Sequence, residues 1–266
     1  MRLVDAARGR ALRAIRRLRV EATARTVVDP LFPAKPMRRY ETALGTYFLP
    51  ADAHADWVAG AMRRGEVFEP EVVEVVRSHA RPGTTVLDVG SNFGQMAILF
   101  SGMVGATGRV LAFEADDYVH AVLRRNLDAA AAGNVRTFLA AVHERSGEEV
   151  IYPEPDFVRF GSYGSYGIDP RATAGRRVKT IAIDDAPIDG AVSFMKVDVQ
   201  GCDLFAMRGA VETIRRHRMP ILFEYEERFQ DEFGTCFQDY VDFVASIGYR
   251  FARTYYGINF LIVPAG

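Results

Sequence analysis

The sequence VLDVGSNFG, residues 86–94, decides the fold of this chain. Apolar residues surround an acid, two glycines follow, and an apolar helical sequence, QMAILF, begins at residue 95. This order predicts a strand, a glycine loop and a helix. A second strand is expected over residues 109–114, and it places Glu114 at its carboxyl end. Together these parts predict the nucleotide-binding corner of a mostly parallel α/β sheet.

The glycine spacing discriminates between adenosine-containing cofactors. A dinucleotide loop has the pattern G-x-G-x-x-G, in which close glycines let a pyrophosphate approach the backbone. Here residues 88–94 read D-x-G-x-x-x-G. S-adenosylmethionine has no phosphate; its amino group suits an acid such as Asp88, and its carboxylate suits loop amides. We therefore predict S-adenosylmethionine, with Glu114 accepting hydrogen bonds from the ribose hydroxyls. An NAD-dependent oxidoreductase stays as the alternative.

A third strand, expected over residues 135–142, ends in Ala141 and Val142. Ligands of open α/β sheets bind at the carboxyl ends of the strands. We expect these small apolar side chains to lie against the adenine, with an ordinary place in the core as the equal alternative. His143 follows them, and an incidental loop position is favoured for it over catalysis. The predicted cofactor-binding residues are Asp88, Gly90, Ser91, Asn92, Gly94, Glu114, Ala141 and Val142.

A second charged motif, MKVDVQG, covers residues 195–201. Residues two apart in a strand share a face, so Lys196 and Asp198 point the same way. Buried charges need partners, and Glu224 ends the next expected strand, residues 221–224. We predict a Lys196–Glu224 ion pair that leaves Asp198 at the mouth of the site.

This arrangement predicts methyl transfer to a hydroxyl group, because a carboxylate can take the proton that the hydroxyl loses. The predicted catalytic residues are Asp198, Lys196 and Glu224. One alternative is a purely structural ion-pair network in which Asp198 caps the next helix. Another is a divalent metal held by Asp198 and Glu224. Two carboxylates are thin support for a metal, so no metal ligand is assigned.

A loop rich in glycine, serine and tyrosine, GSYGSYG over residues 161–167, lies between expected strands at 150–152 and 178–183. Its hydroxyls and aromatic faces suit a sugar or another polyhydroxylated acceptor, and its glycines suit an active-site lid. A flexible hairpin tip is the equal alternative.

Composition excludes several classes of protein. The net charge of −1 over 266 residues argues against a general nucleic-acid binder. Two cysteines are too few for a disulfide framework or a zinc site. No apolar run reaches the roughly 18 residues that a membrane span needs. Since an apolar signal core is also missing near the N-terminus, a cytoplasmic location is expected.

The expected organisation is a basic, Ala/Arg-rich helical extension over residues 1–36 and a methyltransferase domain over 37–266. Within that domain, entry elements are expected at 37–80 and a hairpin or lid insertion at about 148–183. The predicted fold is a Rossmann-like, mostly parallel seven-stranded sheet with helices on both faces and a C-terminal antiparallel hairpin. Contact of residues 1–30 with a membrane surface and formation of a homo-oligomer stay open.

These motifs, in this order, resemble the FkbM-type methyltransferase family over about residues 65–226. The resemblance implies S-adenosylmethionine-dependent methylation, most often of a hydroxyl on a sugar or secondary metabolite. It assigns Lys196 and Asp198 to the active site; a non-catalytic S-adenosylmethionine-binding module is the rival. The family usually has Glu where this chain has Gln200, which removes one carboxylate. The motifs are DVGSNFG (88–94), AFEA (112–115), LRRN (123–126), AVHERSGE (141–148), VKTIAIDD (178–185), MKVDVQGCD (195–203), RGA (208–210) and ILFE (221–224).

Overall fold

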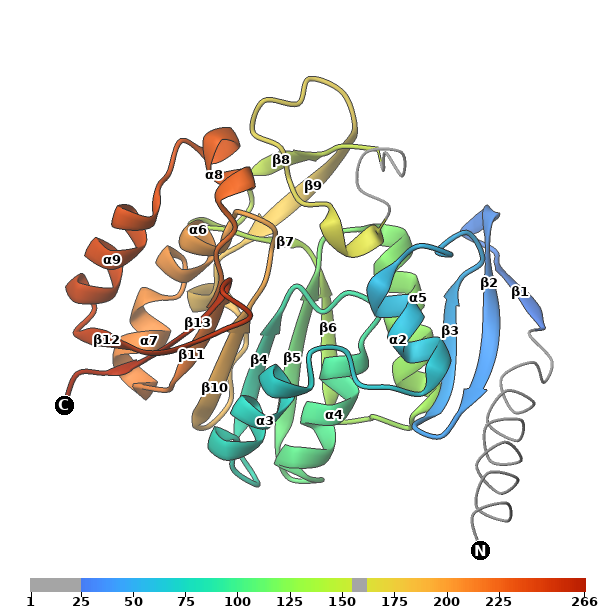
Figure 1. Cartoon of the computed structure of the whole chain (residues 1–266), viewed down its shortest axis with the longest axis horizontal. Coiled ribbons are helices and arrows are strands. Elements are labelled where there is room, and N and C mark those ends of the chain that lie inside the picture. Colours follow the sequence, from blue (N-terminus) through green and yellow to red (C-terminus); the bar gives the residue numbers. More distant parts are fainter. Residues whose placement is uncertain (1–24, 155–161) are drawn as a thin grey trace, which may run out of the picture.

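A computed structural model describes residues 25–154 and 162–266, and a seven-stranded sheet forms its centre (Figure 1). The strands are β4 (Thr85–Val89), β5 (Arg109–Glu114), β6 (Val135–Leu139), β10 (Val192–Val197), β11 (Ile221–Glu224), β12 (Tyr249–Tyr255) and β13 (Asn259–Pro264). Their order across the sheet is β12-β13-β11-β10-β4-β5-β6. β13 runs antiparallel to both of its neighbours, β11 and β12, and with β12 it forms the predicted hairpin; the other pairings of this sheet are parallel. The predicted fold class is therefore confirmed.

Helices cover both faces of this sheet because each strand presents alternate side chains to opposite faces. On one face, three helices cover Val86, Val110 and Phe194. On the other face, three further helices cover Leu87 and Met195. The first group is α3 (Pro70–His79), α4 (Gln95–Val104) and α5 (Asp117–Ala129), and the second is α6 (Asp203–Arg208), α7 (Val211–His217) and α9 (Phe237–Ser246).

The single helix expected from about residue 202 to 217 is divided into α6 and α7. Gly209 lies between them, and a Cβ at this position would come within 2.1 Å of the His143 carbonyl oxygen. Only glycine allows this close approach of the helix pair to the neighbouring strand end. A short helix that the sequence reading did not predict, α8 (Glu227–Phe233), follows β11.

The expected strand over residues 135–142 is also divided. Its end forms a separate strand, β7 (Ala141–Val142), which pairs with β9 (Arg176–Ile181), and β9 pairs antiparallel with β8 (Glu149–Tyr152). This small sheet leads into the described part of the Gly/Ser/Tyr loop, which contains a short 3₁₀ helix, η1 (Tyr163–Ser165). In Figure 1 the small sheet and η1 lie beyond the upper ends of β4 and β5.

A second three-stranded sheet precedes the main one, with β1 (Thr26–Asp29), β2 (Phe32–Thr42) and β3 (Gly45–Pro50), and α2 (Trp57–Arg64) follows it. The prediction of a helix up to residue 36 is thus wrong from residue 26 onward. Valine and threonine favour strands there, and three prolines cannot donate helical hydrogen bonds. The predicted basic helix otherwise falls in residues 1–24, outside the described residues. Met37 and Leu49 anchor this sheet against α5.

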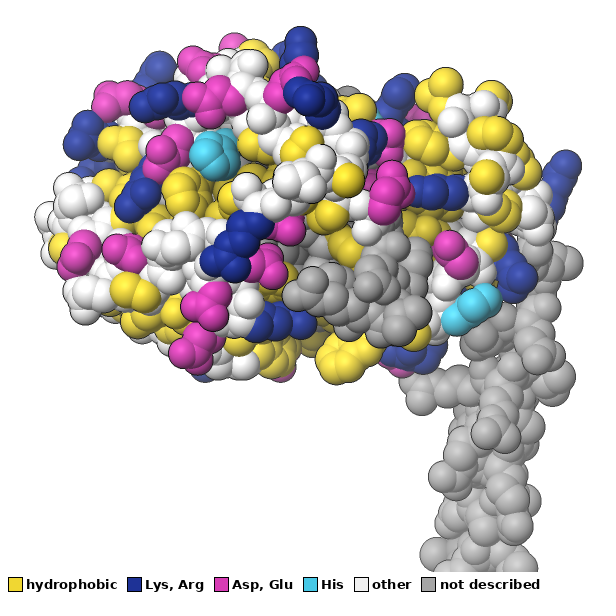
Figure 2. All heavy atoms as spheres, turned by 90° about the horizontal axis from the view of Figure 1, so that it is seen from above, with side chains coloured by type: hydrophobic (Ala, Val, Ile, Leu, Met, Phe, Trp, Pro, Cys, Tyr) yellow, Lys and Arg dark blue, Asp and Glu magenta, His cyan; other side chains and the backbone are white. Residues whose placement is uncertain are grey.

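The described helices include none with the length and apolar character needed to span a membrane. Figure 2 views the molecule from above, and basic and acidic side chains are interspersed over the visible surface of the described residues.

Candidate active site

A cavity of about 640 Å³, counted with its open mouth, lies at the carboxyl ends of β4, β5 and β10. This is the place where open α/β sheets bind ligands, since their parallel strands end together. Its wall brings together six of the residues predicted from the sequence, and it leaves five outside. Those in the wall are Gly90, Asn92, Glu114, Ala141, Val142 and Asp198.

Gly90 joins the two predicted halves of the site. Its φ is +83°, and a Cβ would come within 1.8 Å of the Asp198 carbonyl oxygen, so only glycine lets β4 and β10 end this close together. The amides of residues 90–94 all donate within the protein: Gly90 and Ser91 donate to the Phe113 carbonyl, and Asn92 donates to Glu114. These hydrogen bonds hold the loop, and the contact of its amides with a cofactor carboxylate stays a prediction.

Two further loop positions shape the site without lining it. The Ser91 hydroxyl donates to the Asp88 carbonyl oxygen at 2.8 Å and is buried. Gly94 has φ +87°, and a Cβ there would come within 2.4 Å of Leu123 on α5. Both residues fix the turn from β4 into α4.

Glu114 is buried in the cavity wall, and backbone amides orient its carboxylate. Oε2 accepts from the Asn92 amide and Oε1 from the Asp116 amide, each at 2.9 Å. Burial raises the pKa of Glu114 to about 7, although these two hydrogen bonds oppose the shift. Each carboxylate oxygen can accept a second hydrogen bond, so this group can also accept from two neighbouring hydroxyls of a ribose.

The wall beside Glu114 is apolar and aromatic, as an adenine requires. Ala141 and Val142 are 4% and 3% exposed. Tyr152 also lines the cavity, and its hydroxyl donates to the Tyr166 carbonyl oxygen at 3.1 Å. The cavity thus offers a flat apolar slot next to a hydroxyl acceptor, and these residues fit an adenosine.

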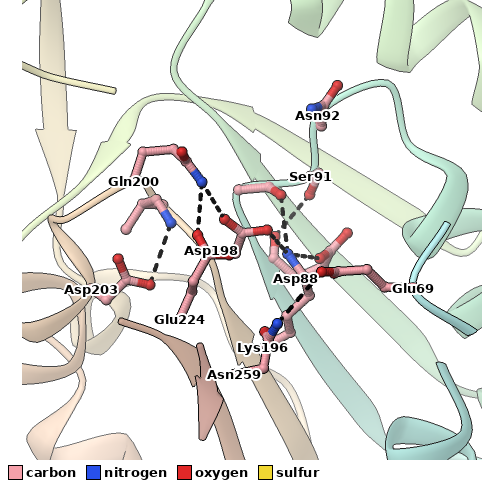
Figure 3. Close-up of polar contacts among 12 residues, drawn as sticks. Glu69, Asp88, Ser91, Asn92, Lys196, Asp198, Gln200, Asp203, Glu224 and Asn259 are labelled. Carbon is pink, nitrogen blue, oxygen red and sulfur yellow. Dashed lines mark hydrogen bonds and ion pairs between the residues drawn. The ribbon is translucent and has the colours of Figure 1, made fainter. Parts of the chain in front are cut away.

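Lys196 pairs with residues other than the predicted one (Figure 3). Its Nζ lies 3.1 Å from Asp198 Oδ2 and 4.0 Å from Asp88 Oδ1, and no contact with Glu224 forms among the described residues. The predicted Lys196–Glu224 ion pair is therefore wrong. Strand register is the reason: Lys196 lies opposite Asp88 on β4 and Leu222 on β11, so Glu224 is level with Asp198 instead.

Glu224 and Asp198 are joined through a side chain that the sequence reading gave no role. The Gln200 Nε2 donates to Asp198 Oδ1 at 2.9 Å and to Glu224 Oε2 at 2.8 Å (Figure 3). A direct hydrogen bond also links Glu224 to Asp198.

The pKa values of this cluster move apart. Burial favours protonation of Asp198, but the Lys196 charge and the hydrogen bonds from Lys196 and Gln200 outweigh it, so the pKa of Asp198 is lowered. Burial and then the charge of Asp198 raise the pKa of Glu224 well above its usual range. The surroundings therefore favour the ionised form of Asp198 and the protonated form of Glu224.

Asp88 lies beneath the cavity and is fully buried. Its carboxylate accepts no hydrogen bond from the described residues, and Lys196 at 4.0 Å is its charged neighbour. Burial raises the pKa of Asp88 to about 6, against the effect of Lys196. An unsatisfied buried carboxylate calls for an explanation, and an amino group of a ligand is one that fits the chemistry.

Glu69 is a second residue that the sequence reading missed. It precedes Pro70 at the start of α3 with φ +47°, and its side chain points toward Asp198 and Lys196 instead of capping the helix (Figure 3). Asn259 Nδ2 donates to Glu69 Oε1 at 3.5 Å. Burial and the charge of Asp198 raise the pKa of Glu69 to about 7. The available signal was an acid directly before a proline at a helix start.

The described part of the Gly/Ser/Tyr loop, residues 162–167, packs over the cavity. Ser162 Oγ and the Tyr163 amide both donate to Asp56 Oδ2 at 2.8 Å, and the Tyr163 hydroxyl donates to Asp52. A Cβ on Gly164 would come within 2.6 Å of Asn92 Nδ2. His143, by contrast, lies outside the cavity wall and stacks on Phe205 at 5.2 Å between ring centroids.

The sequence matches the profile of the methyltransferase FkbM domain over residues 88–251. Among solved structures, it is similar to a methyltransferase FkbM from Methylobacillus flagellatus KT, at 19% identity and a TM-score of 0.47. That comparison covers 77% of this chain and 52% of the other, so the chain spans about half the length of that protein.

Two other solved structures are similar to the chain. One is a SAM-dependent O-methyltransferase from Thermotoga maritima, at 12% identity and a TM-score of 0.47, covering 91% of this chain and 77% of that one. The other is a putative methyltransferase from Streptococcus mutans in complex with SAH, at 11% identity and a TM-score of 0.40, covering 73% and 94%. No curated protein sequence matches the chain.

The profile match covers more than half of the chain and contains both the glycine loop and the Lys196–Glu224 region. Methyl transfer is the reaction of this family and S-adenosylmethionine is its cofactor, which sets aside the NAD-dependent alternative. The chain belongs to the FkbM family of methyltransferases.

Proposed function

We propose that this chain transfers a methyl group from S-adenosylmethionine to a hydroxyl of a small molecule, a sugar or secondary metabolite. The observation that carries the proposal is Asp198, an ionised carboxylate in the wall of a cavity whose opposite side fits an adenosine. The bound cofactor would supply a methyl group activated on a sulfonium. What remains for the protein is to orient the acceptor and take its proton.

Asp198 is suited to hold the acceptor hydroxyl. Lys196 donates to Oδ2 of its carboxylate and Gln200 donates to Oδ1, so the group is fixed from two sides. Its lowered pKa keeps it ionised, so it can accept a hydrogen bond from the acceptor hydroxyl, although it is only a modest base. We assign it the orientation of the hydroxyl and receipt of the proton as the oxygen loses it.

Glu224 and Lys196 support that role. Burial and the charge of Asp198 favour the protonated form of Glu224, which limits the negative charge beside Asp198, and Lys196 favours the ionised form of Asp198. For the cofactor we propose that Glu114 holds the ribose hydroxyls, that Ala141 and Val142 contact the adenine, and that Asp88 attracts the amino group.

The acceptor class follows from the loop above the cavity. Tyr163 and Tyr166 with the glycines around them line this side, and such residues suit a ring that carries several hydroxyls. A sugar or a polyhydroxylated secondary metabolite is the acceptor that we propose.

The test is methyl transfer from a labelled donor to pools of sugars and secondary metabolites, read by mass spectrometry. The parent should label one class of acceptor. Asp198→Asn should keep S-adenosylhomocysteine affinity within a few-fold but lose at least about a hundredfold in turnover, the usual range for a lost acid–base group. Asp242→Asn, which makes the same change at an exposed position of α9, is the control. Binding without turnover on any acceptor pool would instead identify a non-catalytic binding module.

A further inference from the structure

The amide of Gln200 lies between two carboxylates from neighbouring strands. One nitrogen, Nε2, is within 3 Å of Asp198 Oδ1 and of Glu224 Oε2. An NH₂ group has two hydrogens, and both are used here. Two facing carboxylate oxygens are also ligands that a divalent cation could share, and here the amide nitrogen takes the place between them.

The backbone at Gln200 is built to bring this side chain back over the strand ends. Gln200 has φ +53° and is followed by Gly201 with φ +94°. The first value is uncommon for a residue with a side chain and is found mostly where surrounding structure enforces it. A Cβ on Gly167, in the loop above, would contact the Gln200 carbonyl oxygen at 3.1 Å, so the loop packs on this turn. The loop thus holds this turn from one side.

We propose that Gln200 positions Asp198 for the acceptor hydroxyl by filling, with its amide nitrogen, the place of a divalent cation between Asp198 and Glu224. The inference rests on the proposed function, since Asp198 is the group being positioned. It makes this part of the site independent of a metal. Because the Gln200 amide is neutral, the charge of Asp198 is balanced by Lys196. The hydrogen bond from Gln200 also fixes the rotation of the Asp198 carboxylate.

The inference predicts that one substitution turns this place into a metal site. Gln200→Glu exchanges the bridging donor for a third carboxylate beside Asp198 and Glu224. Mn²⁺ alone, titrated by calorimetry into the full chain, should bind this variant at least about tenfold more tightly than the parent, because oxygen-ligand number and charge set such affinities. Gln238→Glu is the matched control: Gln238 also donates to a carboxylate, Asp242, but on the exposed face of α9.

A second variant tests positioning itself. Gln200→Met keeps the length of the side chain and removes both hydrogen bonds. Turnover on the acceptor found in the labelling screen should fall about ten- to a hundredfold, the cost of a misplaced group, with KM for S-adenosylmethionine unchanged. The acid limb of the pH–rate profile should move to higher pH, because Asp198 loses a donor that lowers its pKa.

Either of two results overturns the inference. One is tight Mn²⁺ binding by the parent that Glu224→Gln abolishes, together with loss of turnover in chelator. The other is an unmoved acid limb in Gln200→Met. A chain that binds S-adenosylhomocysteine but methylates nothing would refute the proposed function, while the Mn²⁺ titration would still test the cation place.

Discussion

The two halves of the candidate active site are built in different ways. The cofactor half consists of residues at the ends of β4, β5 and β7, namely Gly90, Asn92, Glu114, Ala141 and Val142. The acceptor half consists of side chains around the ends of β10 and β11, namely Glu69, Lys196, Asp198, Gln200 and Glu224. Backbone amides hold the first half, whereas side-chain charges and hydrogen bonds hold the second.

Because of this difference, the cofactor half is the more rigid one, and the properties of the acceptor half depend more on single side chains. Glu114 is fixed by two amides of the main chain, which a side-chain substitution elsewhere leaves in place. Asp198 is fixed by Lys196 and Gln200, so its pKa and orientation depend on residues that can be exchanged one at a time. We expect substitutions in the acceptor half to change turnover and pH dependence, and those in the cofactor half to change affinity.

The largest expected effect comes from the residue that joins the halves. Gly90→Ala should destabilise the fold by about 3 kcal/mol, the upper end for a strained backbone position. Its Cβ would meet the Asp198 backbone in a conformation that favours glycine. Urea unfolding measures this, and titration with S-adenosylhomocysteine should show lost binding. Gly102→Ala in α4, where a Cβ meets nothing within 4 Å, is the control. If Gly90→Ala is as stable as Gly102→Ala, the close contact at Gly90 does not link the two halves of the site.

A second substitution is expected to change only the affinity of the cofactor half for its ligand. Glu114→Ala should weaken S-adenosylhomocysteine binding by about 1–3 kcal/mol, the cost of losing a charged hydrogen-bond partner. Isothermal titration measures the change, and Glu212→Ala, at an exposed position of α7, serves as the control. Affinity equal to that of the parent would show that Glu114 does not hold the ribose.

A change of pH should act on the same group without a mutation. Because the pKa of Glu114 is about 7, its carboxylate gains a proton as the pH falls below that value. Hydroxyl donors favour the ionised form, so binding must then expel the proton. Affinity for S-adenosylhomocysteine should fall by up to about tenfold per pH unit between pH 7 and 5. The slope should vanish in Glu114→Gln; a slope that persists there would assign the titration to another group.

The smallest expected effect concerns Glu69 in the acceptor half. The folded-state pKa of Glu69 is about 7, above its ordinary value of 4.5, so its ionisation opposes folding above pH 7 and this cost disappears as the pH falls toward 4.5. Glu69→Gln should therefore raise the melting temperature by a few degrees at pH 8, as expected of a small gain in stability. The gain should shrink at pH 5. Glu71→Gln, on the same helix but exposed, should show neither effect.

Several features were readable from the sequence because they are local. The glycine loop and Glu114 lie on consecutive strands, so their spacing along the chain predicts their meeting in space. The two-residue period of a strand likewise predicts that Lys196 and Asp198 share a face, and their side chains are in contact at 3.1 Å. The Ala/Arg-rich N-terminal sequence has no motif that fixes where a helix ends. From residue 26 onward, strand-forming residues and prolines produce strands in place of the predicted helix.

The sequence by itself determined the class of fold and the cofactor, and it predicted the strand ends around the candidate site, because periodicity and glycine spacing act within a few residues. Only the tertiary structure decided which charged side chains of the site lie next to each other. The register of β4, β10 and β11 sets Lys196 beside Asp88 and brings Glu224 level with Asp198. A turn at Gln200 then places one amide between two carboxylates. Register depends on packing across the whole sheet, and a one-residue shift would exchange every partner.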